Sequence, residues 1–385
     1  MKLIYIANAR IPTEKAHGIQ IMKMCEAFAN AGKKVLLIIP WRFNHIKKDP
    51  FDYYNVKRNF KIKKLPCIDL IPLDFILGNF ALWIQTFSFL IFAKLYLLLK
   101  AVAIRGFKSA RTSAPCDILY TREQFTGLFF KDFVLEIHSL PKKIKFFHKK
   151  IWKKSKKLIV LTGFIKKRLI EIGIPENKIL IAPDAVDLEK FDINISKKEA
   201  RKGLNLPLDK KLILYAGSFY LYDWKGIDVL LESIKYFNED YLFVLVGGNK
   251  KEIKKIQNKY QFKHILLVGH QSHEKIPYYL KASDVLVLPN KKGDKFSEEF
   301  TSPLKLFEYM ASKRPIVASG LPSIKEILNE NNAILVKPGG SESLAKGIEK
   351  ALRDPDFCAK ISKQAYKSVQ KYTWNKRVER ILRFI

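Results

Sequence analysis

Short apolar runs alternate with amphipathic stretches along almost the whole chain. In the first half the runs are KLIYIAN, KKVLLIIP, CDILYTR, FVLEIHS and KKLIVLT. In the second half they are KKLILYAGS, YLFVLVGG, HILLVGH, DVLVLPN, RPIVASG and AILVKPG. Continuous apolar strands separated by helices are typical of parallel sheets buried on both faces. The pattern therefore predicts an α/β fold with one doubly wound sheet in each half.

The two series of runs also predict the domain boundaries. We expect a first domain over residues 1–190, a linker over 191–211, where polar and turn residues accumulate, and a second domain over 212–365. Residues 366–385 include the helical pattern YTWNKRVERILRFI. Its Trp374 and Ile381 are expected to dock back on the first domain.

One segment of the first half departs from this alternation. Residues 70–100 are almost continuously apolar, and the apolar region reaches 105, close to the ~20 residues that a membrane-spanning helix needs. Polar residues interrupt the run, so we favour a buried helix of the first domain. The alternative is a helix that lies in a membrane surface, flanked by the basic residues Lys100, Arg105, Lys108 and Arg111.

The composition is that of a globular and strongly basic protein. Of 385 residues, 48% are hydrophobic, and 70 Lys and Arg against 37 Asp and Glu give a formal net charge of +33. Such a surface attracts nucleic acid, anionic lipid headgroups or phosphorylated small molecules. Nucleic acid is not expected, because no zinc-finger spacing, basic-zipper heptad or stacking-platform motif occurs.

Cysteine usage bears on the compartment. Cys25, Cys67, Cys116 and Cys358 are far apart and form no CxxC pair, so we expect neither a metal site nor a disulfide framework. A reducing cytoplasm fits this pattern. The N-terminal MKLIYIANAR reads as a first strand rather than as a signal peptide.

The stretch FTSPLKLFEYMA, residues 300–311, is the first candidate for chemistry. Ser302 is expected to be the N-cap and Pro303 the first residue of a helix, after a long polar loop. Lys305 and Glu308 lie three residues apart and share a helix face. The amide end of such a helix suits an anion, and Glu308 suits a hydroxyl-bearing group.

A second anion site is predicted where KKLILYAGS ends. Gly217 permits close approach of a ligand, Ser218 offers a hydroxyl, and Lys225 precedes Gly226 at the start of a helix. Two anion sites in one half indicate a nucleotide-linked ligand. No GxGxxG follows the first strand and no GxxxxGK[ST] occurs, which disfavours a nicotinamide enzyme or a P-loop ATPase.

The first half offers weaker candidates. Gly18 begins a helix after the first strand, and a single glycine is weak support for a ligand site. His138 follows the strand FVLEI, with Glu136 two residues back on the same side. His138 would hydrogen-bond a sugar hydroxyl or a leaving phosphate, although such a histidine is more often structural.

With these motifs the chain resembles the retaining GT-B glycosyltransferases, specifically glycosyltransferase family 4. PDAVD at 183–187 is similar to the turn that ends the family's first domain, and AGSFYLYDWKGIDVLLESI is similar to its Gly-Arg…Lys-Gly element. The most specific match is ASDVLVLPN followed by TSPLKLFEYMASKRPIVAS, which resembles the donor-binding signature. The resemblance implies two Rossmann-like domains facing a central cleft.

The resemblance also implies roles for individual residues. Glu308 would accept hydrogen bonds from the ribose of a nucleotide sugar, Lys225 would neutralise the leaving diphosphate, and His138 would contact the transferred sugar. Gly18 would let a loop of the first domain close on the phosphates. The remaining donor-binding positions are Gly217, Ser218, Glu299, Phe300, Thr301, Ser302, Pro303, Leu304 and Lys305. No metal ion and no cofactor other than the nucleotide sugar is implied.

Two positions depart from the family pattern. Phe300 occupies the place of the usual first glutamate, with Glu299 and Glu298 beside it, so the sugar is not determined. Ser218 replaces the arginine after the glycine, which leaves Lys225, with help from Lys305, to carry the diphosphate charge.

The expected function is a retaining transferase that moves a sugar from a UDP- or GDP-sugar to a glycan or lipid-linked acceptor. Its expected place is the cytoplasm, peripheral at the inner face of a membrane. One rival is an inverting GT-B transferase or a sugar-nucleotide epimerase, for which Glu136 or Glu123 would be the base. The other is a non-catalytic basic protein that binds membranes or polyanions.

Overall fold

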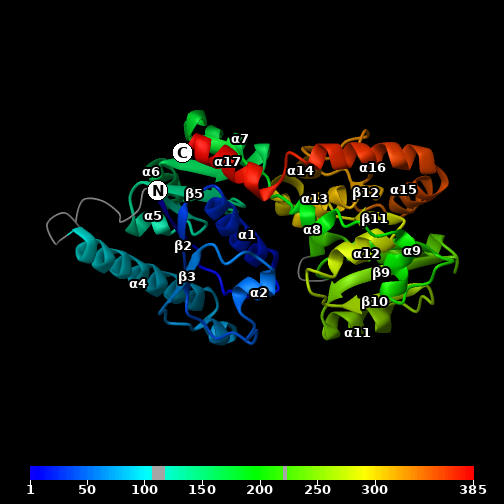
Figure 1. Cartoon of the computed structure of the whole chain (residues 1–385), viewed down its shortest axis with the longest axis horizontal. Helices are drawn as coiled ribbons and strands as arrows, with labels where there is room; N and C mark the ends of the chain where they lie inside the picture. Colours follow the sequence, from blue (N-terminus) through cyan, green and yellow to red (C-terminus); the bar gives the residue numbers. More distant parts are fainter. Residues whose placement is uncertain (106–117, 220–222) are drawn as a thin grey trace. The chain divides into compact units, whose positions relative to one another are not determined.

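The chain forms two compact units (Figure 1). The computed structural model describes residues 1–105, 118–219 and 223–385. The first unit comprises residues 1–161, 165–182 and 374–385, and the second comprises 162–164 and 183–373. Lys108, Arg111 and Cys116 lie outside the described residues.

The first unit is built on a seven-stranded parallel sheet with the strand order β3-β2-β1-β4-β5-β6-β7. Its strands are β1 (Lys2–Ile6), β2 (Lys34–Pro40), β3 (Lys61–Leu65), β4 (Ile118–Thr121), β5 (Phe133–Ile137), β6 (Lys157–Val160) and β7 (Ile179–Ile181). Its helices are α1 (Ala16–Asn30), α2 (Pro50–Tyr54), η1 (Ile71–Leu73), α3 (Asp74–Leu77), α4 (Asn79–Arg105), α5 (Thr126–Phe129), α6 (Phe146–Lys154), η2 (Glu176–Lys178) and α17 (Trp374–Phe384). Helix α7 (Gly163–Glu171) starts at the division between the units.

The second unit is built on a six-stranded parallel sheet with the strand order β10-β9-β8-β11-β12-β13. Its strands are β8 (Lys211–Ala216), β9 (Tyr241–Gly248), β10 (Ile265–Gly269), β11 (Val285–Leu288), β12 (Ile316–Ser319) and β13 (Ile334–Val336). Its helices are α8 (Leu188–Phe191), α9 (Lys197–Gly203), η3 (Asp223–Lys225), α10 (Ile227–Ser233), η4 (Ile234–Tyr236), α11 (Lys250–Lys259), α12 (Ile276–Ala282), the π-helical η5 (Phe296–Phe300), α13 (Leu304–Ala311), α14 (Pro322–Lys325), α15 (Ser341–Arg353) and α16 (Pro355–Val369).

The strands of the second unit are apolar on both faces because each face has its own helix layer. Leu212 and Leu214 of β8 pack in one core with Met310 of α13. The residue between them, Ile213, packs in the other core with Ile348 of α15. This confirms the predicted doubly wound architecture of two parallel sheets.

The unit boundaries differ from the predicted ones. The first unit gives way to the second after Ala182 rather than after residue 190, and residues 191–211 are not a linker. Phe191, Ala200 and Leu206 are buried in a core of the second unit, and Arg201 pairs with Asp284 at 2.7 Å. The polar residues of this segment therefore cover a packed helix rather than a free connection.

The C-terminal segment is divided between the units. Helix α16 runs past residue 365 within the second unit, whereas α17 belongs to the first unit and packs on α1 (Figure 1). Trp374 is 7% exposed and Ile381 is fully buried. The two residues that give α17 an apolar face are thus part of the first unit's interior.

Two strands of the first sheet did not stand out in the sequence. Strand β3, KIKKL, contains three lysines and lies at the sheet edge, where their side chains reach solvent. Strand β7 has only three residues. Both are held by backbone pairing with an apolar neighbour, β2 and β6, respectively.

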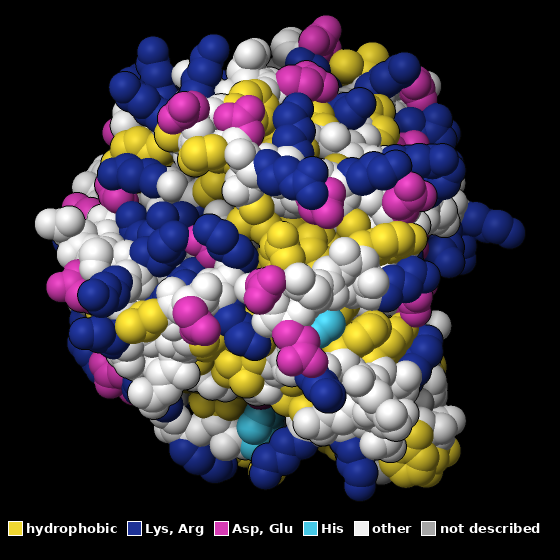
Figure 2. Space-filling model, turned by 90° about the vertical axis from the view of Figure 1, so that its right-hand side faces the viewer, with side chains coloured by type: hydrophobic (Ala, Val, Ile, Leu, Met, Phe, Trp, Pro, Cys, Tyr) yellow, Lys and Arg dark blue, Asp and Glu magenta, His cyan; other side chains and the backbone are white. Residues whose placement is uncertain are grey.

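Basic side chains are spread widely over the surface. Figure 2 shows Lys and Arg across the whole of the face it presents, with Asp and Glu between them and hydrophobic side chains in smaller groups. The net charge of +33 is therefore not confined to one patch of that face.

Candidate functional site

Two tyrosines hold residues 216–218, at the end of β8, in place. The Tyr309 hydroxyl accepts a hydrogen bond from the Ala216 amide at 2.8 Å, and the Tyr215 hydroxyl donates to the Ser218 carbonyl at 3.0 Å. Gly217 has φ +145°, a conformation that side chains rarely adopt. The predicted Gly217 and Ser218 thus lie at the carboxyl edge of the second sheet, where open α/β sheets bind ligands.

The residues that flank Lys225 in the sequence bring it to the same edge of the sheet through their contacts with the loop after β11. A Cβ atom on Gly226 would lie 1.9 Å from the Pro289 carbonyl oxygen, so only glycine permits this approach to the loop after β11. Lys291 of that loop pairs with Asp223 at 2.9 Å and with Asp228 at 2.8 Å. The Lys225 ammonium donates a hydrogen bond to the Ser218 hydroxyl.

Lys305 reaches this point from α13. Its Nζ lies 3.8 Å from the centroid of the Tyr215 ring, and a Cβ on Gly217 would lie 2.5 Å from that Nζ. Two ammonium groups, from Lys225 and Lys305, therefore converge on Gly217 and Ser218.

The pKa values of both lysines are lowered. Burial lowers the pKa of Lys225 to about 8, partly offset by Glu252. Burial, and then the neighbouring charge of Lys225, holds the pKa of Lys305 well below its usual range, while Glu308 acts in the opposite direction. Two adjacent cations in a poorly solvated place favour an anionic ligand.

The start of α13 differs in detail from the prediction. The helix begins at Leu304, its N-cap is Pro303, and no side chain caps it. The Ser302 hydroxyl instead accepts a hydrogen bond from the Asp184 amide at 3.0 Å, which removes it from the capping position. Within the described residues, the amides of Leu304 and Lys305 donate to no protein acceptor, as at most helix starts.

The segment before α13 contains a π-helical turn, Phe296–Phe300, where a long polar loop was expected. Phe300 is 8% exposed and Thr301 is 4% exposed, so both lie inside the fold. The Glu299 carbonyl accepts a hydrogen bond from the Thr162 hydroxyl at 2.7 Å.

Glu308 is 8% exposed and lies one turn along α13 from Lys305. Its Oε1 makes a 2.8 Å hydrogen bond with Nε2 of His273, in the loop between β10 and α12. The His273 ring is packed edge-on against Phe191 at 5.3 Å. No local motif pairs His273 with Glu308, because the two residues are 35 positions apart in the chain.

In the first unit, His138 follows β5 and is bonded through Nε2 to Oε1 of Glu136 at 2.7 Å. Burial, and then the charge of Arg122, lowers the pKa of His138 to about 4, so its ring is neutral near pH 7. A carboxylate only accepts hydrogen bonds, so Nε2 carries the proton and Nδ1 is an acceptor. His138 therefore suits a ligand hydroxyl better than a phosphate.

Glu136 is fully buried and heavily bonded. It accepts hydrogen bonds from Gln20 at 2.7 Å, from Arg377 of α17 at 2.8 Å, and from the Tyr120 hydroxyl. Burial would raise its pKa, but Arg377 and then His138 bring that pKa well below the usual range. This structural role argues against Glu136 as the base of an inverting enzyme.

Glu123, the other carboxylate considered as a base, follows β4. Its Oε1 accepts a hydrogen bond from the Phe125 amide at 3.1 Å. Burial raises its pKa, with hydrogen bonds from Phe125 and Asn8 acting in the opposite direction.

Packing within the first unit explains why residue 18 is a glycine. A Cβ atom there would lie 2.1 Å from the Tyr54 hydroxyl, which accepts from the Thr13 amide at 2.7 Å and donates to the Thr13 carbonyl at 2.9 Å. Any part in donor binding stays a prediction for this glycine.

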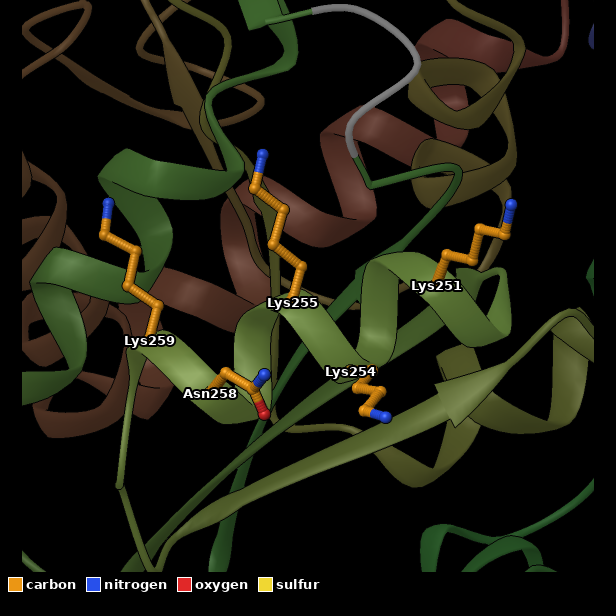
Figure 3. A pocket seen from close by; sticks show the side chains of 5 residues that line it. All are labelled: Lys251, Lys254, Lys255, Asn258 and Lys259. Carbon is orange, nitrogen blue, oxygen red and sulfur yellow. The ribbon is translucent and has the colours of Figure 1, made fainter.

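A separate basic depression lies on α11. Lys251, Lys254, Lys255, Lys259 and Asn258 line it, and their side chains spread to different sides of the helix (Figure 3). Among the described residues, no three His, Cys, Asp or Glu side chains are grouped so as to hold a metal ion.

Comparison with known proteins gives consistent results. Residues 196–368 match the family model of Glycosyl transferases group 1. An uncharacterized glycosyltransferase of Methanocaldococcus jannaschii is 27% identical over 229 residues, 57% of this chain and 56% of the relative. A lipopolysaccharide 1,2-N-acetylglucosaminetransferase of Salmonella typhimurium is 24% identical over 239 residues, 58% of this chain and 60% of the relative. The matches thus span little more than half of these relatives' length.

A solved structure extends the comparison to the whole fold. The structure of HepE from Anabaena in complex with UDP-glucose matches with a TM-score of 0.73 and 14% identity, over 100% of both chains. The chain therefore has the GT-B fold, and its residues 196–368 are similar to the Glycosyl transferases group 1 family.

Proposed function

We propose that the protein is a retaining glycosyltransferase that uses a UDP- or GDP-sugar to extend a glycan or lipid-linked acceptor in cell-envelope polysaccharide or glycolipid synthesis. The observation that carries the proposal is the convergence of Lys225 and Lys305 on Gly217 and Ser218 at the carboxyl edge of the second sheet. The unpaired amides at the start of α13 and the buried Glu308 lie on the helix that supplies Lys305.

In this proposal the diphosphate of the donor occupies the positive field of the two lysines. The acceptor oxygen forms a bond to the anomeric carbon as the bond to the diphosphate oxygen breaks. The acceptor proton passes to the leaving diphosphate on the same face of the sugar. The lysines stabilise the charge that develops on that leaving group, a role in which one lost donor costs about 10²–10³ in rate.

Metal independence is part of the proposal and rests on these same cations. Two ammonium groups and the helix-start amides supply the positive charge that a divalent ion would otherwise provide to a diphosphate.

Glu308 is assigned to the donor ribose. One carboxylate oxygen is bonded to His273, which orients the group, and in this proposal the other oxygen accepts a hydrogen bond from a ribose hydroxyl. His138 is assigned to the transferred sugar through its acceptor Nδ1. The roles of Gly18, Glu299, Phe300 and Thr301 follow only from the family resemblance.

The acceptor part of the proposal draws on the relatives. One of them is named for transfer to lipopolysaccharide, a lipid-bearing acceptor, and a structural neighbour binds UDP-glucose. In this proposal the enzyme works as a peripheral protein at the cytoplasmic face of a membrane, where a lipid-linked acceptor would be presented.

A thermal-shift screen tests the donor site. The full chain is heated with UDP, GDP, ADP or TDP and their sugars, without added metal, alongside Glu308→Ala. A nucleotide at 100 times its Kd should stabilise the wild type by about 2.7 kcal/mol and the variant less. A shift from none of them, or an equal shift in Glu308→Ala, would contradict the proposed donor site.

A further inference from the structure

Large exposed hydrophobic side chains gather on α3 and α4 of the first unit. Phe80 is 63% exposed and Leu99 is 70% exposed. The other large hydrophobic side chains of α3 and α4 that are substantially exposed are Phe75, Ile76, Leu82, Trp83, Ile91, Phe92, Leu95 and Leu98, and the whole set is here called the α4 apolar face. An exposed apolar patch of this extent usually marks a docking surface.

The opposite side of α4 is packed along its whole length. Every fourth residue is at most 3% exposed, in the series Ala81, Gln85, Phe89, Ala93, Leu97 and Ala101. Figure 1 shows α4 beside β3, with which it is in contact. The predicted buried helix is therefore buried on one side only.

Hydrogen bonds between α4 and the loop after β1 fix the orientation of α4. The Gln85 amide donates to the Asn8 side chain at 2.9 Å, and Asn8 donates to the Thr86 hydroxyl at 2.8 Å. Helix α4 has the length and composition of a spanning helix, but only by that criterion. A helix bonded to the loop after β1 cannot be surrounded by lipid, so it is suited to lie along a bilayer surface.

Lysines lie beside α4 at two places. Lys63 of β3 and Lys100 of α4 hold their Nζ atoms 5.7 and 5.6 Å from the centroid of the Tyr96 ring of α4. Lys154 of α6, whose charge interacts with that of Lys94 of α4, donates a hydrogen bond to the Gly127 carbonyl at 2.8 Å. Burial, and then the charges of Lys131, Lys150 and Lys94, lowers the pKa of Lys154, while Asp132 raises it. An apolar face with lysines beside it is complementary to anionic lipid.

An aromatic cluster continues the α4 apolar face toward the carboxyl edge of the first sheet. The ring centroids of Trp83 and Phe125 lie 5.1 Å apart. The ring centroid of Phe87 lies 5.6 Å from that of Phe125 and 5.9 Å from that of Phe129. Phe125 follows β4, and its amide donates a hydrogen bond to the Glu123 carboxylate. The apolar face thus adjoins the sheet edge at which open α/β domains bind ligands.

We propose that the α4 apolar face docks the first unit on an anionic bilayer, with α4 in the plane of the surface and the lysines beside it on the headgroups. The inference rests on the proposed function in that it names where a lipid-linked acceptor would be presented. A second copy of the chain is a poorer occupant, because an isologous contact through this face would bring the same lysines together.

Vesicle flotation of the full chain without donor tests the proposal. The probes are vesicles of phosphatidylcholine alone or with 30% phosphatidylglycerol. Leu95→Asn/Leu99→Asn removes two exposed members of the apolar face, and Leu208→Asn/Leu266→Asn is the matched control on exposed leucines of the second unit. We expect the α4 variant to bind anionic vesicles at least tenfold more weakly than wild type, and the control to bind within twofold of it.

Two matched triple variants distinguish the lysines beside α4 from the general basicity of the protein. Lys61→Gln/Lys63→Gln/Lys64→Gln, which neutralises Lys63 and the two other exposed lysines of β3, should weaken binding to anionic vesicles at least tenfold at low salt. Lys251→Gln/Lys254→Gln/Lys255→Gln, which removes the same charge from α11 (Figure 3), should leave it within threefold. Equal losses in both variants would overturn the proposal in favour of non-specific attraction.

Further outcomes decide against the proposal. No vesicle binding by the wild type overturns it. A loss of self-association in Leu95→Asn/Leu99→Asn, seen by gel filtration, would assign the face to a protein contact instead. Glu308→Ala should still bind vesicles, so failure of the docking surface and failure of the donor site give different results.

Discussion

At the scale of single residues, the candidate site brings the ammonium groups of Lys225 and Lys305 to one edge of the second sheet. Lys225 bonds to the Ser218 hydroxyl and Lys305 lies on the Tyr215 ring. The structure therefore contains two ammonium groups at the carboxyl edge of a sheet whose pKa values are depressed by burial.

The depressed pKa of Lys225 predicts a pH dependence of donor binding. With a pKa of about 8, Lys225 is charged below that pH and must regain a proton to bind a diphosphate above it. Affinity for the nucleoside diphosphate should thus fall by up to tenfold per pH unit above pH 8. Lys225→Arg should reduce this slope, because arginine stays charged. Titrations at pH 7.5, 8.5 and 9.5 check it, and identical slopes in both proteins would contradict it.

The predictable and unpredictable residues of the site differ in a physical way. Gly217, Lys225, Lys305 and Glu308 occur in local motifs, so their neighbours in the chain identified them. His273 reaches Glu308 from a different loop, and nothing local marks it. Likewise Ser302 has the sequence of an N-cap, but the Asp184 amide, distant in the chain, takes its hydroxyl.

At the scale of elements, α17 is tied to the first unit by one buried charge. Arg377 donates to Glu136 at 2.8 Å and to the Ala182 carbonyl at 3.0 Å. Glu136 is fully buried on β5, so the pair joins the last helix to the middle of the sheet.

Removing Arg377 should therefore destabilise the first unit strongly. Arg377→Met leaves the Glu136 carboxylate buried without its cation, a change that costs about 3–5 kcal/mol. Hydrogen exchange should accelerate in peptides of β5 and α17. Arg380→Met, on the same helix with an exposed bond to the Ile181 carbonyl, is the control and should change exchange little. Equal effects of the two substitutions would contradict the assigned role.

The Arg377–Glu136 pair also makes the stability of the first unit sensitive to acid. The pKa of Glu136 is lowered in the folded state, so its contribution to stability is present above the unfolded value of about 4.3. It is lost as the pH falls through the lower folded value.

Element prediction succeeded where burial dictates composition. Strands apolar on both faces stood out in the sequence, whereas β3, with its exposed edge lysines, did not. The segment 191–211 was mistaken for a linker because its charged residues cover α9, whose buried side, with Ala200 and Arg201, is short. For α4, composition favoured a buried helix, and only the structure shows that one side remains exposed.

At the scale of the whole molecule, the two units have different chemistry. The second unit contains the lysine pair, Glu308 and the region that matches Glycosyl transferases group 1. The first unit contains the apolar face of α4, the lysines beside it and the His138 network. The proposed function assigns the donor to the second unit and the acceptor, with its membrane, to the first.

The central claim is that the lysine pair binds the diphosphate of a nucleotide sugar. Calorimetric titration of the full chain with UDP and GDP tests it most directly, using Lys225→Ala and, as a matched lysine control on α11, Lys251→Ala. We expect one nucleotide to bind the wild type and Lys251→Ala equally and to bind Lys225→Ala at least tenfold more weakly. Equal binding by all three proteins, or binding of neither nucleotide to the wild type, would contradict it.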